Sequence, residues 1–405
     1  MKIAIVVQGR FHAFDLARAL LQRGHDVTLF TNYPKWAVER FNFPSGHVRS
    51  FWVHGVVSRA TESLRSRNVL SGAEDKLHRL FGRWAADEIQ KEKWDVVHPW
   101  SGVSEEIIKA LAPRDELVVV MRGSAHIRTQ ARILEEEESR TGISQQRPSP
   151  WIISREQREY SLADRVVVLS SFAYGTFLEE KFPSERLWLL PLGSEVNAFR
   201  PSGAVMEARC RRILAGEPLR VLYVGALSFQ KGLWDLEIIV RSLSDQKFRF
   251  RFIGPVSPEA KKFIAKISPP AEIVSKQSQE ALPNSYSWGD VFMFPTLQDG
   301  FAQVLAQANA SALPILATTN CSGPDFLTDG ENGWVLPIRS PEAFARRLRW
   351  CDAHRGELAA MARRIYTQFQ PRDWSAVATD FETMCLNHLK RSKGKGSVLW
   401  EARAT

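Results

Sequence analysis

The sequence is poor in cysteine and contains no long apolar segment. Its cysteines are Cys210, Cys321, Cys351 and Cys385, which lie far apart and form no Cys-x-x-Cys pair, so neither a zinc site nor a disulfide framework is predicted. No segment approaches the ~20 apolar residues that cross a bilayer, and the apolar run at residues 3–7 is too short for a signal-peptide core. These absences predict reduced thiols and a cytoplasmic location, with at most peripheral contact to the inner face of a membrane.

The composition is that of a globular protein with an excess of positive charge. The chain has 405 residues, of which 44% are hydrophobic and 24% charged, and its formal net charge is +9. This length suffices for two domains. Positive charge favours an anionic partner such as nucleic acid, an anionic membrane surface or an anionic substrate. Because the basic residues are scattered and no recognition module is present, nucleic acid is not an expected partner.

The first half of the chain has the strand and helix order of a doubly wound parallel sheet. A β-branched apolar run at residues 2–7, helical spacing at 14–23 and a strand at 25–31 form the first unit. Further strands are predicted at 94–98, 117–121, within 161–171 and at 187–193. Such sheets bind ligands at the carboxyl ends of their strands, so the loops at 8–12 and 122–126 are expected ligand sites. The first loop is no G-x-G-x-x-G fingerprint, so it predicts a dinucleotide only weakly.

The second half repeats this order. A buried strand at 219–224, a glycine-containing loop with Lys231 and a helix at 233–243 are followed by short strands near 248–254, 273, 290–294, 314–317 and 333–335. We expect two Rossmann-like α/β domains facing a cleft. The predicted boundaries are 1–200 for the first domain, 201–218 for a linker, 219–372 for the second domain, 373–391 for a helix crossing back and 392–405 for a basic flexible tail.

The stretch 295–314 combines a carboxylate, a tight turn and a helix start. Asp299 ends a predicted strand, Gly300 lets backbone approach a ligand, and the helix from about Phe301 begins with amides that have no intrahelical partner. A helix N-terminus of this kind suits a phosphate. Gln307 follows Asp299 by just over two helical turns, so the two side chains can hold opposite ends of one elongated ligand. Local pattern alone favours the alternative of an ordinary turn followed by an ordinary helix.

Residues 51–93 join aromatic and basic residues in a helical stretch. The aromatic ones are Trp52, Phe81 and Trp84, and the basic ones are Arg59, Arg65, Arg67, Lys76, Arg79 and Arg83. Such a face can lie on anionic lipid head groups. The alternative is a solvated helix whose aromatic side chains belong to the core.

Several of these residues carry a resemblance to a known family. Asp299-Gly300-Phe301, Val304-Leu305, Ala308, Ala310, Leu313-Pro314 and Asp329-Gly330-Glu331-Asn332-Gly333 resemble the donor-site stretch of glycosyltransferase family 4, the retaining, sugar-nucleotide-dependent enzymes with the GT-B fold. Gly225 and Lys231-Gly232 are similar to its diphosphate loop. Arg122-Gly123-Ser124-Ala125-His126, Arg155-Glu156 and Pro191-Leu192-Gly193 resemble the first domain of one bacterial subgroup, so the likeness covers nearly the whole chain.

The resemblance implies a role for each matching position. Catalytic roles would fall to His126, Asp299 and Lys231; donor contacts to Gly225, Lys231, Asp299, Gly300, Phe301, Ala302, Gln303, Val304 and Gln307; and acceptor or phosphate contacts to Gly9, Arg10, His12, Arg122, Gly123 and Ser124. Lys231 and the amides of Gln303 and Val304 would hold the diphosphate. The partners implied are a nucleotide sugar and a glycan or lipid-linked acceptor of the bacterial cell envelope, with no cofactor and no metal, since no Asp-x-Asp motif lies in a plausible place.

The chain departs from the family pattern at several positions. Asp299 and Gln307 stand where the family usually has glutamates, Ala226 where many relatives have an arginine, Arg122 where they have a histidine, and Ala302 replaces a glycine. Losing a charged partner of a pyrophosphate costs ~1.5 to 3 kcal/mol unless another cation replaces it. These departures keep open a catalytically weakened sugar-nucleotide-binding protein, and a GT-B-like sugar-nucleotide epimerase is a further alternative.

Overall fold

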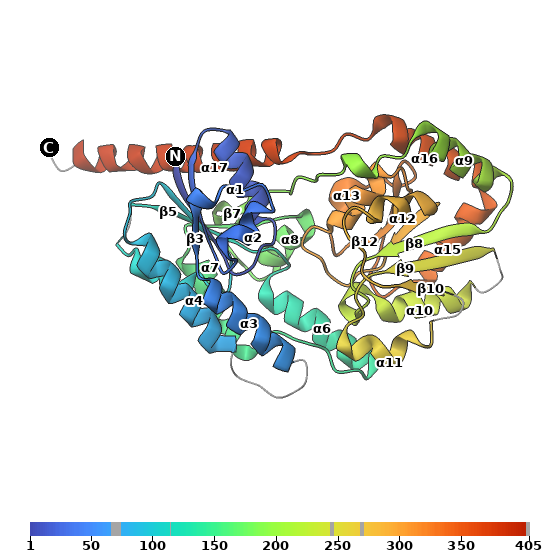
Figure 1. Cartoon of the computed structure of the whole chain (residues 1–405), viewed down its shortest axis with the longest axis horizontal. Coiled ribbons are helices and arrows are strands. Elements are labelled where there is room, and N and C mark those ends of the chain that lie inside the picture. Colours follow the sequence, from blue (N-terminus) through green and yellow to red (C-terminus); the bar gives the residue numbers. More distant parts are fainter. Residues whose placement is uncertain (66–73, 114, 244–246, 268–270, 402–405) are drawn as a thin grey trace.

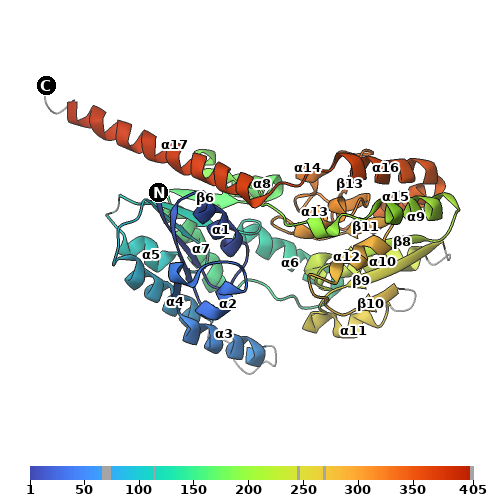
Figure 2. The same ribbon diagram turned by 45° about the horizontal axis from the view of Figure 1, so that its top comes forward.

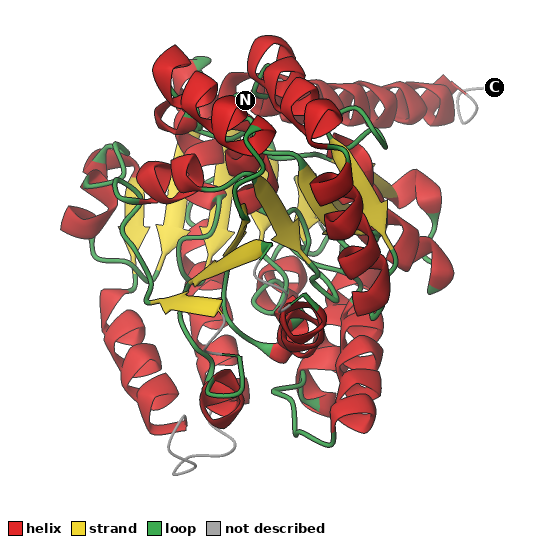
Figure 3. Ribbon diagram, turned by 90° about the vertical axis from the view of Figure 1, so that its right-hand side faces the viewer, coloured by secondary structure: helices red, strands yellow, loops and turns green. Residues whose placement is uncertain are grey.

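The computed structural model describes residues 1–65, 74–113, 115–243, 247–267 and 271–401 and shows two α/β domains side by side (Figure 1). Each domain is built on one parallel sheet, seven-stranded in the first and six-stranded in the second. Figure 3 shows the strands between layers of helices. The predicted fold class is therefore confirmed.

The N-terminal sheet has the strand order β3-β2-β1-β4-β5-β6-β7. Its strands are β1 (Lys2–Val7), β2 (Asp26–Thr31), β3 (Val48–Ser50), β4 (Val96–Pro99), β5 (Leu117–Met121), β6 (Arg165–Val168) and β7 (Leu187–Leu189). Its helices are α1 (Ala13–Gln22), α2 (Lys35–Glu39), α3 (Trp52–Arg65), α4 (Glu74–Ile89), α5 (Glu105–Ala110), α6 (Ile127–Thr141), α7 (Pro150–Leu162) and α8 (Ser171–Glu179).

The C-terminal sheet has the strand order β10-β9-β8-β11-β12-β13. Its strands are β8 (Leu219–Val224), β9 (Phe248–Ile253), β10 (Ala271–Val274), β11 (Val291–Phe294), β12 (Ile315–Thr318) and β13 (Gly333–Leu336). The helices are α9 (Gly203–Leu214), α10 (Leu233–Ser242), α11 (Lys261–Ile264), α12 (Leu282–Trp288), α13 (Gln303–Ala310), α14 (Gly323–Phe326), α15 (Pro341–Ala353), α16 (Arg355–Gln368) and α17 (Trp374–Glu401).

Burial on both faces explains why the sheets form from continuous apolar runs. Along β1, Ile3, Ile5 and Val7 belong to the core on one side of the sheet, whereas Ala4 and Val6 belong to the core on the other. A strand that is covered on both faces needs apolar side chains at successive positions rather than at alternate ones. These continuous apolar runs allow the central strands to be predicted from the sequence.

Helix α17 ties the end of the chain to the first domain. It starts beside the C-terminal domain and runs back across the N-terminal one (Figure 2). Val377, Ala378, Phe381 and Cys385 are buried in the N-terminal core, next to α1. In the described part of the chain, no helix has the length and apolar character that crossing a bilayer requires.

Two predicted segments take a different form. Residues 201–218 are not an open linker: most of them form α9, which packs on α16 and buries Cys210 and Ile213 in the second domain's core. Arg209 is fully buried because its guanidinium donates to the carbonyls of Ser311 and Ala312. The predicted flexible tail is also helical up to Glu401.

Candidate active site

A cavity of about 340 Å³ lies between the two domains and is lined by both. The N-terminal domain contributes His12, Gly123, Leu169 and Leu192, and the C-terminal domain contributes Gly225, Ala226, Lys231, Phe294, Asp299, Phe301, Ala302, Gln303 and Val304. Most of these residues follow the carboxyl ends of β-strands, where doubly wound sheets place their ligands.

Lys231 and Asp299 form an ion pair in the wall of this cavity. The Lys231 Nζ lies 2.6 Å from Asp299 Oδ2, and the other carboxylate oxygen accepts hydrogen bonds from the amides of Phe301 and Ala302, at 3.0 and 2.7 Å. Burial acts to raise the pKa of Asp299, but the Lys231 ammonium and the two amides outweigh it, so this pKa lies below its ordinary value. Asp299 is therefore an ionised group that holds Lys231 and the turn in place.

The turn after Asp299 brings the two domains into contact. A Cβ atom on Gly300 would lie 2.0 Å from the Gly123 carbonyl oxygen, so only glycine permits this approach. Ala302 then has a φ of 58°, the left-handed conformation that favours glycine. Helix α13 starts immediately afterwards, and the amides of Gln303 and Val304 at its first positions have no intrahelical acceptor. These amides lie in the cavity wall and can hold an anion.

The side chains of Gln303 and Gln307 both have protein partners. Gln303 bridges the domains, since its Nε2 donates to the Gly193 carbonyl at 2.9 Å and its Oε1 accepts from the Ser194 hydroxyl at 2.5 Å. Gln307 Oε1 accepts from the Tyr286 hydroxyl at 2.9 Å. Gln307 is not part of the cavity lining, in contrast to Gln303.

The loop after β5 places its backbone, not its charged side chains, at the cavity. Gly123 lines the wall, and Ser124 Oγ donates to Gln298 Oε1 across the domains at 2.7 Å. Arg122 is buried and donates to Glu156 at 3.0 Å and to the Ala125 carbonyl. Its guanidinium is thus held inside the N-terminal domain.

His126 also lies behind the cavity wall. Its ring packs on Tyr160 and Phe177, with centroids 5.3 and 4.8 Å away, and its Nδ1 accepts from the Arg128 amide as the N-cap of α6. Burial and the charge of Arg122 lower the pKa of His126 to about 4. The imidazole is therefore neutral at physiological pH.

His12 is the polar side chain that the N-terminal domain brings to the cavity. Its ring lies 5.1 Å from the ring of Trp100 and 6.5 Å from that of Trp374, which starts α17. Burial lowers the pKa of His12 to about 3, and its Nε2 has no hydrogen-bond partner among the described residues. The N-terminal wall thus presents a neutral imidazole that is backed by two tryptophan rings.

The rest of the loop after β1 points elsewhere. The Gly9 amide donates to Asn32 Oδ1 at 2.8 Å, and the Arg10 guanidinium lies over the Phe41 ring at 3.9 Å. Neither residue belongs to the cavity lining. Sequence reasoning missed Trp100 and Trp374, because a tryptophan after a strand or at a helix start has no distinctive local pattern.

Comparison with solved structures identifies the class of fold. HepE from Anabaena superimposes with a TM-score of 0.68 over 96% of this chain and 100% of its own, at 12% sequence identity. WaaG, a glycosyltransferase involved in lipopolysaccharide biosynthesis, has a TM-score of 0.63 over 95% of this chain and 99% of its own, at 14% identity. At such low identities the likeness shows the fold alone, which is the GT-B fold.

Sequence comparison then identifies the family. Residues 10–197 match the model described as Glycosyltransferase Family 4, and residues 218–352 match the model described as Glycosyl transferases group 1. The two models cover both domains, so the chain belongs to the family 4 glycosyltransferases with the GT-B fold.

The curated relatives are distant. Sulfoquinovosyl transferase SQD2 of Arabidopsis thaliana is 27% identical over 201 residues, which are 48% of this chain and 38% of SQD2. A GDP-mannose-dependent alpha-mannosyltransferase of Mycobacterium tuberculosis is 27% identical over 58% of this chain and 59% of its own. The putative colanic acid biosynthesis glycosyltransferase WcaL of Escherichia coli is 22% identical over 51% of this chain and 52% of its own. This chain thus spans about half the length of the curated relatives it matches.

Proposed function

We propose that this protein transfers a sugar, with retention of anomeric configuration, from a nucleoside-diphosphate sugar to a hydroxyl of a glycan or lipid-linked acceptor in bacterial envelope polysaccharide synthesis. The observation that carries the proposal is the cavity between the domains, where Lys231 and the first amides of α13 face the same space. An ammonium and free helix amides together form a site for a diphosphate.

The ligands described for structurally similar proteins support a nucleoside-diphosphate sugar as the donor. Solved HepE structures are described as complexes with UDP and with UDP-glucose, and a starch synthase from Arabidopsis thaliana is described as bound to ADP and acarbose. Relatives named for the synthesis of colanic acid and lipopolysaccharide support the envelope assignment.

In the proposed reaction, the bond between the anomeric carbon and the diphosphate breaks while negative charge grows on the departing phosphate. Lys231 and the amides of Gln303 and Val304 would stabilise that charge, and Asp299 would keep Lys231 in position. Oriented cations and dipoles of this kind usually supply the largest catalytic contribution. We propose that the enzyme needs no metal, because these groups supply the charge that a cation would otherwise provide.

The acceptor side of the proposal rests on the N-terminal domain. The phosphate would leave on the face that the acceptor hydroxyl approaches, and its oxygen would take the acceptor proton. His12 and Gly123 lie on that side of the cavity. Neutral His12, flanked by Trp100 and Trp374, suits a sugar ring, whose CH face packs on aromatic side chains and whose hydroxyls donate to an unprotonated nitrogen. His126 would act by positioning the loop between Gly123 and α6.

An exposed apolar surface next to this side supports a membrane-bound acceptor. Trp52, Val53, Val56 and Val57 form a stripe on α3, each 47 to 57% exposed, and Trp36 on neighbouring α2 is 60% exposed. The basic neighbours Arg40 and Arg59 lie over Trp36 and Tyr33. Apolar and basic side chains in this arrangement suit the surface of an anionic bilayer. Flotation with anionic vesicles tests this membrane surface as a partner. Wild type should float with the vesicles, and the Trp52→Ser/Val56→Ser variant should not.

The structure changes which residues form this surface. Phe81 is fully buried and Trp84 packs on Phe30 and Phe51, so both belong to the core rather than to the predicted membrane face. Arg67 and the side chain of Arg65 lie outside the described residues.

A second candidate is a sugar-nucleotide-binding protein with weak turnover. It is favoured by Ala226, which lies in the cavity wall where many relatives have an arginine, so that Lys231 is the one lysine or arginine side chain in the described lining. An epimerase, the third reading, would convert the donor without an acceptor.

Release of free nucleoside diphosphate from UDP-, GDP- and ADP-sugars, without added metal, tests the proposal. Wild type should hydrolyse one donor slowly, faster with acceptor, and Lys231→Ala should lose about 10²-fold or more of this activity. Lys262→Ala, on α11 of the same domain, is the matched control. Donor binding without turnover in any acceptor mixture would favour the binding protein, and absence of binding would exclude both.

A further inference from the structure

Among the described residues, the helices of the C-terminal domain leave part of one face of β9 and β10 uncovered. From β8 to β10 the chain moves in one direction across the sheet, and from β10 to β13 it moves back past β8. Because crossovers between parallel strands are right-handed, α10 and α11 lie on one face and α12 to α14 on the other. The second face of β9 and β10 is therefore left open at the edge of the sheet.

The sequence of β9 fits a strand with one covered and one open face. Phe248, Phe250 and Phe252 are buried, whereas the intervening Arg249 is exposed and Arg251 is partly exposed. The same sheet is apolar on both faces at its centre, where β11 and β12 are fully buried. Alternation of phenylalanine and arginine is thus a local departure, confined to this edge.

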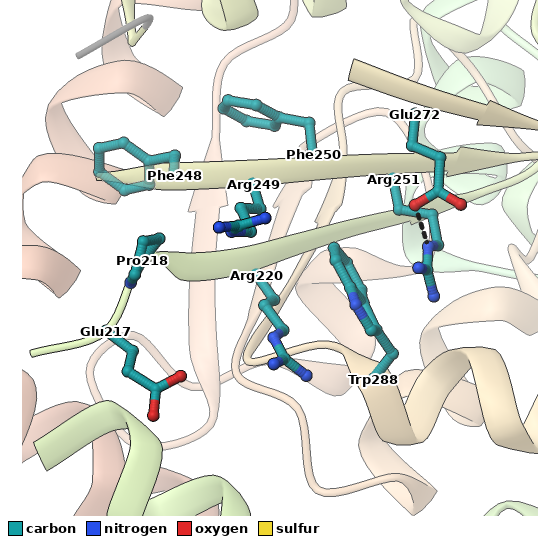
Figure 4. A pocket seen from close by; sticks show the side chains of 9 residues that line it. All are labelled: Glu217, Pro218, Arg220, Phe248, Arg249, Phe250, Arg251, Glu272 and Trp288. Carbon is teal, nitrogen blue, oxygen red and sulfur yellow. Dashed lines mark hydrogen bonds and ion pairs between the residues drawn. The ribbon is translucent and has the colours of Figure 1, made fainter. Parts of the chain in front are cut away.

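A groove of about 480 Å³ lies on the open face. We call it the arginine groove and define it by Arg220, Arg249, Arg251, Glu272 and Trp288 (Figure 4). Its volume is in the range of small-molecule sites. It begins at the amino end of β8, whereas Gly225 and Lys231 follow the carboxyl end of that strand, so it is separate from the cavity between the domains.

The three arginines of the groove differ in their partners. Arg251 donates to Glu272 at 2.8 Å, and its guanidinium lies 4.1 Å from the Trp288 ring centroid. Arg220 lies on the same ring at 5.8 Å, but neither its side chain nor that of Arg249 has a hydrogen bond or ion pair with a described residue. Two guanidiniums in the groove are therefore available to an anion.

The charge around Arg220 is incompletely balanced. Burial, and then the positive charge of nearby Arg212, lower the pKa of Arg220, and the carboxylates of Asp290 and Glu217 offset this only in part. Arg212 itself is paired with Asp290 at 2.5 Å, and Glu272 is paired with Arg251. A carboxylate or phosphate bound between Arg220 and Arg249 would supply the missing negative charge.

We propose that the arginine groove binds a segment of an acidic glycan, with sugar carboxylates on Arg220 and Arg249 and a sugar ring on the part of Trp288 that the arginines leave exposed. Planar guanidiniums bind carboxylates through paired hydrogen bonds, and an aromatic ring next to them accommodates the apolar face of a sugar. The identity of the glycan as this enzyme's own acceptor or product rests on the proposed function.

Other anionic partners fit the groove less well. A lipid needs exposed apolar side chains for its acyl chains, but Phe248 and Phe250 are buried here and the exposed apolar stripe lies on α3 of the other domain. A nucleic acid strand needs a basic track with several aromatic platforms, whereas the groove has one tryptophan and ends at Glu217. The second site would hold a growing chain while its end reacts in the cavity.

Calorimetric titration with an oligogalacturonate, at about 0.15 M salt to suppress non-specific attraction, tests the proposal. We expect binding by wild type, about tenfold weaker binding by Arg220→Ser/Arg249→Ser, and none by wild type to a maltodextrin of matched length. Arg211→Ser/Arg346→Ser, which removes the same charge from exposed positions of α9 and α15, is the control and should bind as wild type does. Trp288→Leu should weaken binding with all three arginines present.

Each other outcome overturns the proposal. Equal losses in both double variants would mean non-specific attraction, and unchanged binding by Arg220→Ser/Arg249→Ser would place the anion elsewhere. Tighter binding of an oligothymidylate of matched charge would assign the groove to nucleic acid instead. Lys231→Ala should still bind the oligogalacturonate, so this result is independent of whether the cavity handles a nucleotide sugar.

Discussion

The two walls of the cavity differ in charge although both are built from loops at the carboxyl ends of parallel strands. The C-terminal wall carries the Lys231–Asp299 ion pair and the first amides of α13, which have no intrahelical acceptor. The N-terminal wall carries neutral His12 and the backbone of Gly123, while Arg122 is turned inward to Glu156. The same fold, used twice, thus gives one wall with a lysine and free amides and one neutral wall.

In the proposed reaction, the C-terminal wall would serve the departing diphosphate and the N-terminal wall the acceptor. Charge that is to be stabilised needs fixed donors, and a helix N-terminus beside an ion pair provides them without reorganisation. A sugar hydroxyl acceptor needs shape and neutral acceptors rather than cations. Three experiments test this difference between the walls. They separate the two walls, protonate the histidines of the N-terminal domain, and remove the hydrogen bonds that join the domains.

The largest effect is expected from Gly300→Ala, which separates the walls. The new Cβ would lie 2.0 Å from the Gly123 carbonyl oxygen, so the domains must move apart. A displacement of this size costs about 100-fold in kcat/KM, while each domain stays folded. Steady-state kinetics with the identified donor measures the loss, and Gly356→Ala, where the added methyl meets nothing within 4 Å, is the control. Equal activity of the two variants would refute the close approach.

The next effect concerns pH and distinguishes the two domains. Half-buried His12 and buried His98 and His126 of the N-terminal domain have pKa values lowered by desolvation to about 3, 4 and 4. Below about pH 6.5 these imidazoles are protonated in the unfolded chain but stay neutral in the folded protein. The free energy of unfolding therefore falls as pH falls. Between about pH 7.5 and about pH 5.5, each contributes a loss of about 1 kcal/mol in the free energy of unfolding.

Denaturant unfolding of His12→Gln/His98→Gln at both pH values measures this contribution. The variant should lose about 2 kcal/mol less than wild type over the same interval, whatever its stability at neutral pH. His354→Gln, at an exposed position of the C-terminal domain, should behave as wild type. An unchanged pH dependence in the double variant would show that the acid sensitivity lies elsewhere.

The smallest effect is expected from Gln303→Ala, which removes the bridge to Gly193 and Ser194. Two hydrogen bonds of about 1 kcal/mol each hold the two domains together beside the cavity, so KM for the donor should rise up to about tenfold with little change in kcat. Gln368→Ala on α16, an exposed position, is the control. A large fall in kcat instead would mean that Gln303 acts on the reacting groups.

Much of the fold was predictable from the sequence because the central strands are buried on both faces. The bounds of β1, β5 and β8 follow directly from short apolar runs. Strand β3 is only three residues long and was missed. The arginine-rich sequence of α9 predicts a solvent-exposed linker, whereas Arg209 is held inside by backbone carbonyls that no local pattern reveals.

The candidate site was predictable where its residues are close in sequence and less so where packing decides. Asp299, Gly300 and the start of α13 form one continuous stretch, and Lys231 reaches it from the repeated strand-loop-helix unit. By contrast, the inward orientation of Arg122 depends on Glu156, and the surroundings of His12 depend on Trp374 from the far end of the chain. The local sequence around either residue gives no signal of such contacts between distant segments.

The proposed diphosphate site at Lys231 is tested most directly by calorimetry. Binding of UDP, GDP and ADP is measured for wild type, Lys231→Ala and Lys262→Ala in the presence of a metal chelator. We predict that wild type and Lys262→Ala bind one of these nucleotides equally well, and that Lys231→Ala binds it at least about tenfold more weakly because a charged partner of the diphosphate is lost. Undiminished affinity of Lys231→Ala for the nucleotide would contradict a role of Lys231 in diphosphate binding. Binding by wild type only after a divalent metal is added would contradict a metal-independent site.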